Sequence, residues 1–126
     1  VNIGSVHAIA TSNNISAYAA SKGALASLTR AAAIELSQKN IRVNCILPGA
    51  IDTSMLHEGL NRDKNSRCDN RDRLKDLANK TVLRRIGRPD EVAQSVLFLA
   101  DELRSSFITG QMVVVDGGAT AKLSTE

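Results

Sequence analysis

The sequence predicts an α/β fold built on a doubly wound parallel sheet, because short apolar stretches alternate with long helical ones. Three short stretches rich in Val, Ile and Leu have the length and composition of buried strands. They span residues 1–5, 41–47 and 111–115. Longer segments with helical spacing of apolar residues separate them, and this alternation is typical of parallel sheets covered by helices on both faces.

The first predicted strand, residues 1–5, has no cap, turn or targeting segment before it, and the chain opens with Val1 rather than Met. A sequence that begins inside a buried strand is typical of a fragment. We therefore expect residues 1–126 to be one portion of a single domain whose preceding strands complete the sheet.

The next segment, residues 17–38, predicts a long helix that carries the only tyrosine of the chain. Tyr18 and Lys22 are four residues apart, so they share a helix face and the ammonium group can lie beside the phenol. A neighbouring cation favours the ionised phenol, which makes Tyr18 a candidate acid and base. Taken alone, a Tyr and a Lys at this spacing more often lie on a solvated helix face than in a catalytic site. Ser5, at the end of the first predicted strand, would by itself more often be a strand-end cap.

Apolar residues lie on every side of the 17–38 helix, so we expect two of its faces to be buried. One face can pack on the sheet. The other carries small residues that allow a second helix to approach closely, namely Ala20, Gly23, Ala24, Ser27 and Ala31. We expect a contact between subunits there, and the alternative is that a preceding part of the same protein covers this face.

The second predicted strand, residues 41–47, is broken by Pro48 and Gly49, and Ile51 and Thr53 follow. Proline fixes the turn and glycine removes a side chain, so the backbone of this loop can approach a ligand closely.

A basic segment follows this loop. Between Asn61 and Arg88, ten Lys and Arg residues stand against four Asp, an excess of six positive charges in a chain of net charge +3. The segment has no aromatic residues for base stacking, so we do not expect it to bind nucleic acid. Its charge fits an anionic substrate or carrier, and equally a solvated surface.

The last predicted elements are a helix and a strand. Pro89 suits the first turn of a helix that runs to about Asp101 or Leu103, and Asp90 complements the positive end of that helix. A connection over residues 105–110 leads to the strand at 111–115.

The composition describes a soluble α/β protein with an aliphatic core, since 43% of the residues are hydrophobic and only 2% are aromatic. No apolar run approaches the ~20 residues needed to span a bilayer. Cys45 and Cys68 form neither a disulfide framework nor a metal-binding spacing, which favours a cytoplasmic protein. His7 and His57 have no Cys or carboxylate partner at ligand spacing, so we expect no metal and assign both to loop or pocket-lining positions.

Taken together and in this order, these motifs resemble those of the short-chain dehydrogenase/reductase family over nearly the whole chain. The matching residues are Ser5, Tyr18, Lys22, Pro48, Gly49, Ile51, Thr53, the segment Gly87-Arg88-Pro89-x-Glu91-Val92, Thr109-Gly110-Gln111 and Val115-Asp116-Gly117-Gly118. Within this family, the motifs and their order are most similar to those of 3-oxoacyl-carrier-protein reductases and of sugar and polyol dehydrogenases. The resemblance implies the C-terminal half of a Rossmann fold. The glycine-rich dinucleotide-binding half, the catalytic asparagine and the residues that choose between NAD and NADP would precede Val1.

The resemblance also implies reversible hydride transfer between NAD or NADP and a small carbonyl compound or secondary alcohol, free or bound to a carrier. Tyr18 would exchange a proton with the substrate oxygen, Ser5 would hold that oxygen, and Lys22 would stabilise the tyrosinate and bind the nicotinamide ribose. Residues 54–86 would form a variable substrate lobe, and the 17–38 helix a subunit contact in a homotetramer or dimer. The nicotinamide end of the cofactor would contact Tyr18, Lys22, Pro48, Gly49, Ile51 and Thr53.

The alternative function is that of an inactive fragment or pseudoenzyme that contributes only an oligomerising surface. We expect the 126-residue chain, expressed alone, to show no reductase activity and no tight dinucleotide binding. We also expect it to aggregate, because an open sheet edge and a large aliphatic surface would lie in water.

Overall fold

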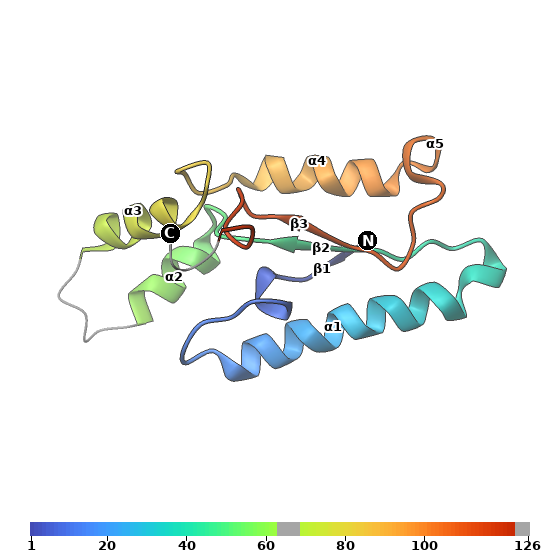
Figure 1. Cartoon of the computed structure of the whole chain (residues 1–126), viewed down its shortest axis with the longest axis horizontal. Helices are drawn as coiled ribbons and strands as arrows, with labels where there is room; N and C mark the ends of the chain where they lie inside the picture. The colour runs from blue at the N-terminus through green and yellow to red at the C-terminus, as the bar shows by residue number, and fades with distance from the viewer. Residues whose placement is uncertain (63–68, 123–126) are drawn as a thin grey trace.

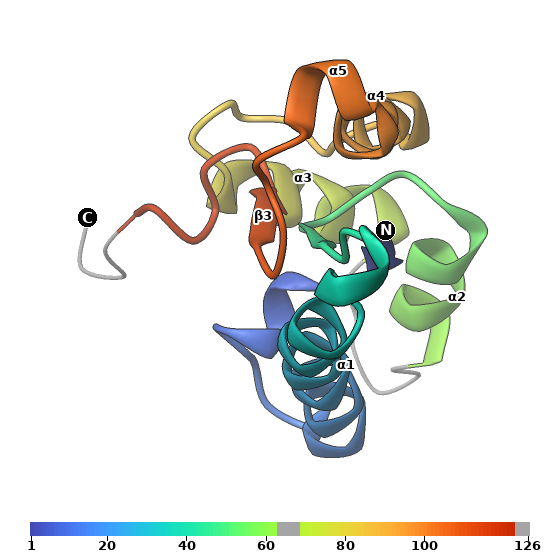
Figure 2. The same cartoon turned by 90° about the vertical axis from the view of Figure 1, so that its right-hand side faces the viewer.

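The computed structural model describes residues 1–62 and 69–122 and confirms the predicted α/β fold (Figure 1). In these residues three parallel strands form one sheet in the order β1-β2-β3. The strands are β1 (Asn2–Ile3), β2 (Cys45–Pro48) and β3 (Met112–Val115). Helix α1 (Ser16–Glu35) covers one face of the sheet and helix α4 (Pro89–Ala100) covers the other, as Figure 2 shows end-on. These layers are those of a doubly wound sheet.

The pairing of the strands brings their carboxyl ends to one edge of the sheet. Ile3 of β1 lies opposite Ile46 of β2, and Pro48 of β2 lies opposite Val115 of β3. Helices α2 (Ser54–Arg62) and α3 (Asn70–Lys80) lie beyond this edge, at the left in Figure 1. In open parallel sheets ligands bind outside the carboxyl ends of the strands, so this edge is the place to look for a site.

The shorter elements complete the connections. They are the 3₁₀ turns η1 (Val6–Ala8) and η2 (Ser37–Lys39) and the helix α5 (Glu102–Ser105). None of the helices within residues 1–62 and 69–122 combines the length and the apolar character that a membrane span needs.

The core is aliphatic and lies on both faces of β2. Ile46 and Leu47 of β2 are fully buried, α1 contributes Ala26 and Ala33, and α4 contributes Leu99. Small residues on α1 let the helix lie close to the sheet, which is how a core without large aromatic side chains fills its volume.

The second strand starts four residues later than the sequence predicts, because the residues before it direct their hydrogen bonds elsewhere. The Val43 N–H donates to the hydroxyl of Thr109 at 3.1 Å. The buried Asn44 amide donates to the Ile108 carbonyl at 2.8 Å and accepts the Gln111 N–H at 3.0 Å. These bonds fasten the segment to the loop before β3 instead of extending the strand.

The two long helices also end earlier than predicted. Helix α1 ends at Glu35, and residues 37–39 tighten into η2 before Asn40, which has a left-handed φ of 55°. Helix α4 begins at Pro89 as predicted but ends at Ala100. Asp101 then leaves the helical conformation, and its side chain accepts the Leu103 N–H and starts α5. A short polar side chain that competes for backbone donors is a common cause of such a break.

Among the described residues helix α1 buries one face, and the second face, for which the composition predicts a partner, is exposed. The buried side chains, Ala26, Thr29 and Ala33, all face the sheet side. On the opposite side Leu28 and Ile34 are 58% and 76% exposed. An apolar helix face of this kind is one that a protein normally covers.

Candidate active site

Ser5 stands at the carboxyl end of β1, where the chain leaves the sheet. It is only 6% exposed. Its hydroxyl accepts the backbone N–H of His7 at 3.2 Å, so Ser5 caps the η1 turn that follows it. This bond uses an acceptor position of the hydroxyl and leaves its proton free to bond a ligand oxygen.

Tyr18 lies in the first turn of α1, and α1 packs against η1, the turn that Ser5 caps. The phenol side chain is 39% exposed. One helical turn later, the ammonium Nζ of Lys22 lies 5.6 Å from the centre of the Tyr18 ring. It also donates a hydrogen bond to the Ile3 carbonyl at 3.1 Å. The helix spacing therefore does bring the cation beside the phenol, as the sequence predicts.

His7 is the other side chain that contacts Tyr18. The two rings meet edge to face, with their centres 5.7 Å apart and their planes at 75°. The Nδ1 atom of His7 is buried and has no hydrogen-bond partner among the described residues. Burial lowers the pKa of His7 below its usual 6.5, so the imidazole is neutral at neutral pH.

The loop after β2 lies at the same edge of the sheet. Gly49 donates its N–H to the Val115 carbonyl at 3.0 Å. The loop then pairs with the segment before α4 through an isolated bridge between Ile51 and Gly87. Bonds from the Gly87 N–H to the Ala50 carbonyl and from the Asp52 N–H to the Gly87 carbonyl, both 2.9 Å, fix its path.

Two contacts tie this loop to α2. Thr53 precedes the helix, and its hydroxyl accepts the Leu56 N–H at 3.3 Å and lies 3.3 Å from the Ile51 carbonyl. The imidazole of His57 contacts the Asp52 carboxylate at 2.7 Å. The sequence spacing indicated no carboxylate partner for His57, but the first turns of α2 bring its ring to Asp52 in the preceding loop. The lobe over residues 54–86 therefore begins firmly attached to the loop, while residues 63–68, including Cys68, lie outside the described residues.

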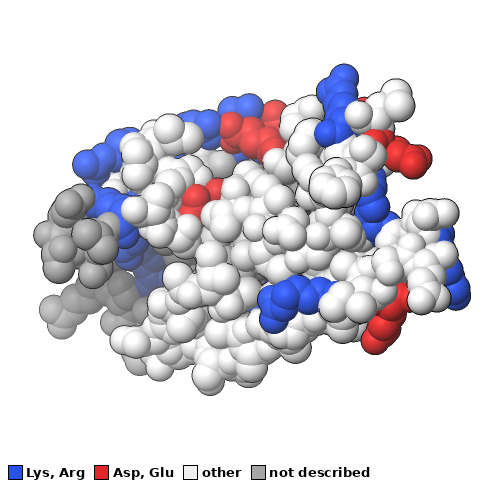
Figure 3. All heavy atoms as spheres, turned by 45° about the vertical axis from the view of Figure 1, so that its right-hand side comes forward, with Lys and Arg blue, Asp and Glu red and all other residues white. Residues whose placement is uncertain are grey.

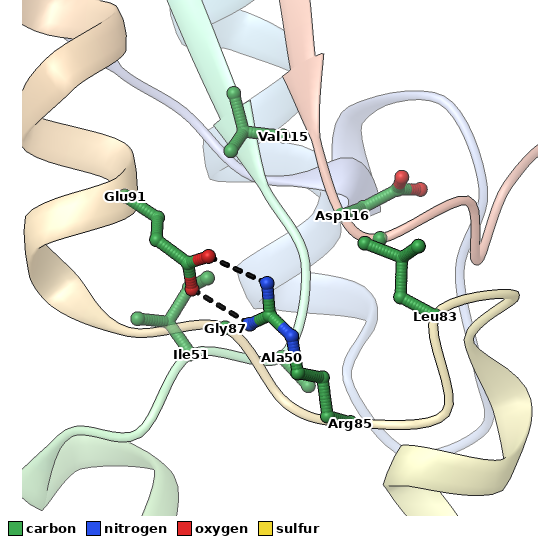
Figure 4. A pocket seen from close by; sticks show the side chains of 9 residues that line it. Ala50, Ile51, Leu83, Arg85, Gly87, Glu91, Val115 and Asp116 are labelled. Atoms are coloured by element: carbon green, nitrogen blue, oxygen red, sulfur yellow. Dashed lines mark hydrogen bonds and ion pairs between the residues drawn. The ribbon is translucent and has the colours of Figure 1, made fainter.

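This edge of the sheet also carries an ion pair between Arg85 and Glu91, which the sequence motifs did not predict. Glu91, in the first turn of α4, accepts two hydrogen bonds from the Arg85 guanidinium, at 2.8 and 2.6 Å. Figure 4 shows the two groups facing each other at the rim of a pocket of about 110 Å³. This pocket does not include Ser5, Tyr18 or Lys22, and it is far smaller than a dinucleotide site requires.

Because Glu91 forms this ion pair, we expect the free energy of unfolding to depend on pH. Hydrogen bonds from Arg85 and from the Arg88 N–H lower the pKa of Glu91 from 4.5 to about 2. Its stabilising contribution is therefore present above pH 4.5 and is lost as the pH falls toward about 2. We expect Glu91→Gln to lower the free energy of unfolding at pH 7, and the difference from wild type to shrink between pH 4.5 and 2 in urea titrations.

Glu58→Gln is the matched control, because the exposed Glu58 forms no ion pair with any other described residue. A difference between wild type and Glu91→Gln that stays constant down to pH 2 would show that the ion pair does not stabilise the fold.

The structure thus brings the site residues predicted from sequence to one edge of the sheet, in two groups. The first group is Ser5, Tyr18 and Lys22, on β1 and α1; the second is Pro48, Gly49, Ile51 and Thr53, on the loop after β2. Their roles stay predictions. Sequence reasoning placed His7 only in a general pocket-lining role, although its position two residues after Ser5 was the available signal.

Among the described residues, N–H donors of Lys22 and Ile51 on this edge are free to bind the nicotinamide end of a cofactor. The Lys22 ammonium has three N–H donors and uses one on Ile3, so donors remain for ribose hydroxyls. Within the described residues the Ile51 N–H has no hydrogen-bond partner and can bind a carboxamide oxygen. These donors fit the nicotinamide end. For metals, the described part of the chain holds no group of three His, Cys, Asp or Glu side chains placed to bind an ion.

Comparisons with known proteins match nearly the whole chain. Residues 1–120 match the family profile described as enoyl-(acyl carrier protein) reductase. The chain is 40% identical over 121 residues to cyclopentanol dehydrogenase of Comamonas testosteroni, covering 96% of this chain and 45% of that protein. It is 44% identical over 119 residues to 3-oxoacyl-acyl-carrier-protein reductase FabG of Chlamydia muridarum, covering 94% and 43%.

Solved structures resemble it as well. The crystal structure of a short chain dehydrogenase family protein from Francisella tularensis superposes with a TM-score of 0.89 at 33% identity, covering 95% of this chain and 50% of that one. The chain thus spans about half the length of the curated relatives that it matches.

Proposed function

Because this chain belongs to the short-chain dehydrogenase/reductase family, we propose that the full-length protein is an NAD(P)-dependent oxidoreductase acting on a carbonyl compound or secondary alcohol. The observation that carries this proposal is the pairing of Tyr18 with Lys22 on α1. Helix α1 packs against η1, the turn that Ser5 caps at the carboxyl edge of the parallel sheet. Singly, each of these residues has an ordinary structural explanation. Together they supply a proton, a cation and a second hydrogen-bond donor within one small region.

The chain's own residues have distinct tasks in the reduction direction. The cofactor, when bound, supplies a hydride to the carbonyl carbon. Tyr18 donates its phenol proton to the carbonyl oxygen as that oxygen gains negative charge. Ser5 donates a hydrogen bond to the same oxygen and holds it in place. In the oxidation direction the same groups act in reverse, with the tyrosinate accepting the alcohol proton.

Lys22 acts through charge and through its remaining donors. A tyrosinate formed after proton transfer lies beside the ammonium, and this attraction stabilises it. The free N–H groups can also bind the hydroxyls of the nicotinamide ribose. Pro48, Gly49 and Ile51 would hold the loop backbone against the nicotinamide ring, and the Thr53 hydroxyl, which bonds the Ile51 carbonyl here, would bind the carboxamide.

The substrate is proposed to be a small carbonyl compound or alcohol, free or attached to a carrier. The relatives include a reductase whose name specifies an acyl-carrier-protein substrate and a dehydrogenase of a cyclic alcohol. The lobe formed by α2 and α3 stands at the same end of the sheet as the proposed site and would enclose the substrate (Figure 1).

The exposed side of α1 is proposed to contact a second subunit. In Figure 3 the lower part of the visible face, which α1 forms, carries mostly uncharged side chains. Ser27, Leu28, Ala31 and Ile34 are all exposed there. We expect Ala31→Arg to dissociate the oligomer, because a buried unpaired charge at a close helix contact is strongly destabilising. Light scattering of the full-length protein measures this effect.

The control for this variant is Gln38→Arg, which adds the same charge on an exposed residue of η2, beyond the end of α1. It should leave the molar mass unchanged. A wild-type protein that is monomeric in the same measurement would contradict the proposal for α1.

The proposed activity is tested by assaying the full-length protein against a panel of ketones and aldehydes with NADH and with NADPH. Consumption of either cofactor that depends on a carbonyl compound supports it. Absence of turnover across the whole panel, in both directions, would favour the pseudoenzyme alternative.

A further inference from the structure

His7 lies between Ser5 and Tyr18, although the proposed hydride transfer assigns it no role. It follows Ser5 by two residues, and its backbone N–H is held by the Ser5 hydroxyl. Its ring leans edge-on against the Tyr18 ring, 5.7 Å between centres. The backbone of His7 is thus fixed to Ser5 and its imidazole to Tyr18, the two groups that are proposed to bind the reacting oxygen.

The two ring nitrogens of His7 are in different surroundings. The ring as a whole is partly exposed, and of its nitrogens only Nδ1 is buried without a partner among the described residues. A buried N–H without an acceptor is rarer in proteins than a buried acceptor without a donor. We therefore assign the proton of the neutral ring to Nε2, which has no hydrogen-bond partner in the described part of the chain and can donate to a ligand.

We propose that His7 donates a hydrogen bond from Nε2 to a second oxygen of the substrate, one or two carbons away from the reacting carbonyl. A carbonyl oxygen bound by Tyr18 and Ser5 would place the neighbouring carbons of the substrate close to the imidazole, because the imidazole contacts the Tyr18 ring and the His7 backbone N–H bonds Ser5. The substrate class is then a hydroxy-substituted or oxo-substituted carbonyl compound, or the corresponding alcohol.

Neutrality of the ring supports this role over an ionic one. Burial lowers the pKa of His7, so the imidazole is a neutral donor at neutral pH and suits a hydroxyl or carbonyl oxygen better than it suits a carboxylate. This inference rests on the proposed function, and it concerns which carbonyl compounds are favoured rather than whether hydride transfer occurs.

Two pairs of ketones of matched shape test the inference on the full-length protein. Acetoin is paired with 3-methyl-2-butanone, and 4-hydroxy-2-butanone with 2-pentanone, so that within each pair a hydroxyl replaces a methyl group. The measured quantity is the ratio of kcat/KM for the hydroxylated ketone to that for its partner. This ratio does not depend on how much of a variant is folded.

We expect wild type to favour the hydroxylated member of at least one pair, and His7→Phe to lower that ratio by about three- to tenfold, the usual worth of one neutral hydrogen bond. Phe keeps an aromatic edge against Tyr18 and removes the Nε2–H donor together with the unpartnered Nδ1. His7→Gln, whose amide can still donate, should retain part of the preference.

A ratio that His7→Phe leaves unchanged, or a wild type without preference for the hydroxylated ketones, would overturn the inference. Equal losses for both members of a pair would show that the ring serves only to pack against Tyr18. In these cases turnover of other panel carbonyls leaves the proposed function standing. Absence of any turnover overturns the proposed function and the inference with it.

Discussion

Tyr18→Phe in the full-length protein is expected to lower turnover of carbonyl substrates by about 10²-fold or more, the usual order for a positioned general acid. The substitution deletes one hydroxyl and keeps the ring that contacts His7, so the fold and the ring packing should remain. Steady-state assays with a saturating cofactor give kcat, and fluorescence titration gives the affinity for the cofactor, which should change little.

Two comparison variants separate the roles within this pair. Lys22→Ala should reduce turnover and also weaken cofactor binding, because the ammonium both faces the Tyr18 ring and offers donors to the ribose. Ser37→Ala removes an exposed helix-end hydroxyl and should leave both quantities unchanged. Near-normal turnover by Tyr18→Phe would contradict the assignment of Tyr18 as the acid.

Gly49→Ala is expected to have the largest effect on the loop after β2. A Cβ atom at Gly49 would lie 2.7 Å from the Asp116 Cβ and 2.9 Å from the Asp116 Cα. Asp116 cannot easily yield, because its carboxylate accepts hydrogen bonds from the Gly118 N–H and from both the N–H and the hydroxyl of Thr120, each at 2.8 Å. The loop must therefore move away from β3.

We expect this clash to destabilise the protein by about 1–3 kcal/mol, as overpacking against rigid neighbours does, and to raise KM for the cofactor. Urea unfolding and cofactor titration measure the two effects. Gly59→Ala in α2 is the matched control, since a Cβ there meets nothing within 4 Å and alanine favours a helix. If Gly49→Ala is as stable as wild type and binds cofactor equally well, the loop is more adaptable than the structure indicates.

Patterns that depend on local chemistry were predictable from the sequence. The three strands, the start of α4 at Pro89 and the shared face of Tyr18 and Lys22 follow from composition and spacing alone. The family followed from the order of motifs along the chain, and the comparisons confirm it.

Features that depend on distant partners were not predictable. The strand predicted at 41–47 begins only at Cys45, because the Asn44 side chain bonds the loop before β3, more than 60 residues away in the sequence. The pairing of His57 with Asp52 depends on where α2 begins, and the contact of His7 with Tyr18 depends on the packing of η1 against α1. Apolar composition likewise shows that α1 has two faces to cover, but it does not show which partner covers the second.

The central claim is that hydride passes between a nicotinamide cofactor and a substrate carbon, while Tyr18 donates a proton to the substrate oxygen or accepts one from it. Reduced cofactor that carries deuterium at both C4 positions of the nicotinamide, mixed with the full-length protein and the panel ketone it reduces fastest, tests that claim most directly. We predict an alcohol that carries one deuterium on its carbinol carbon, detected by mass spectrometry, and a rate of labelling that Tyr18→Phe lowers about 10²-fold. Alcohol without deuterium, or labelling at the same rate in Tyr18→Phe, would contradict the account.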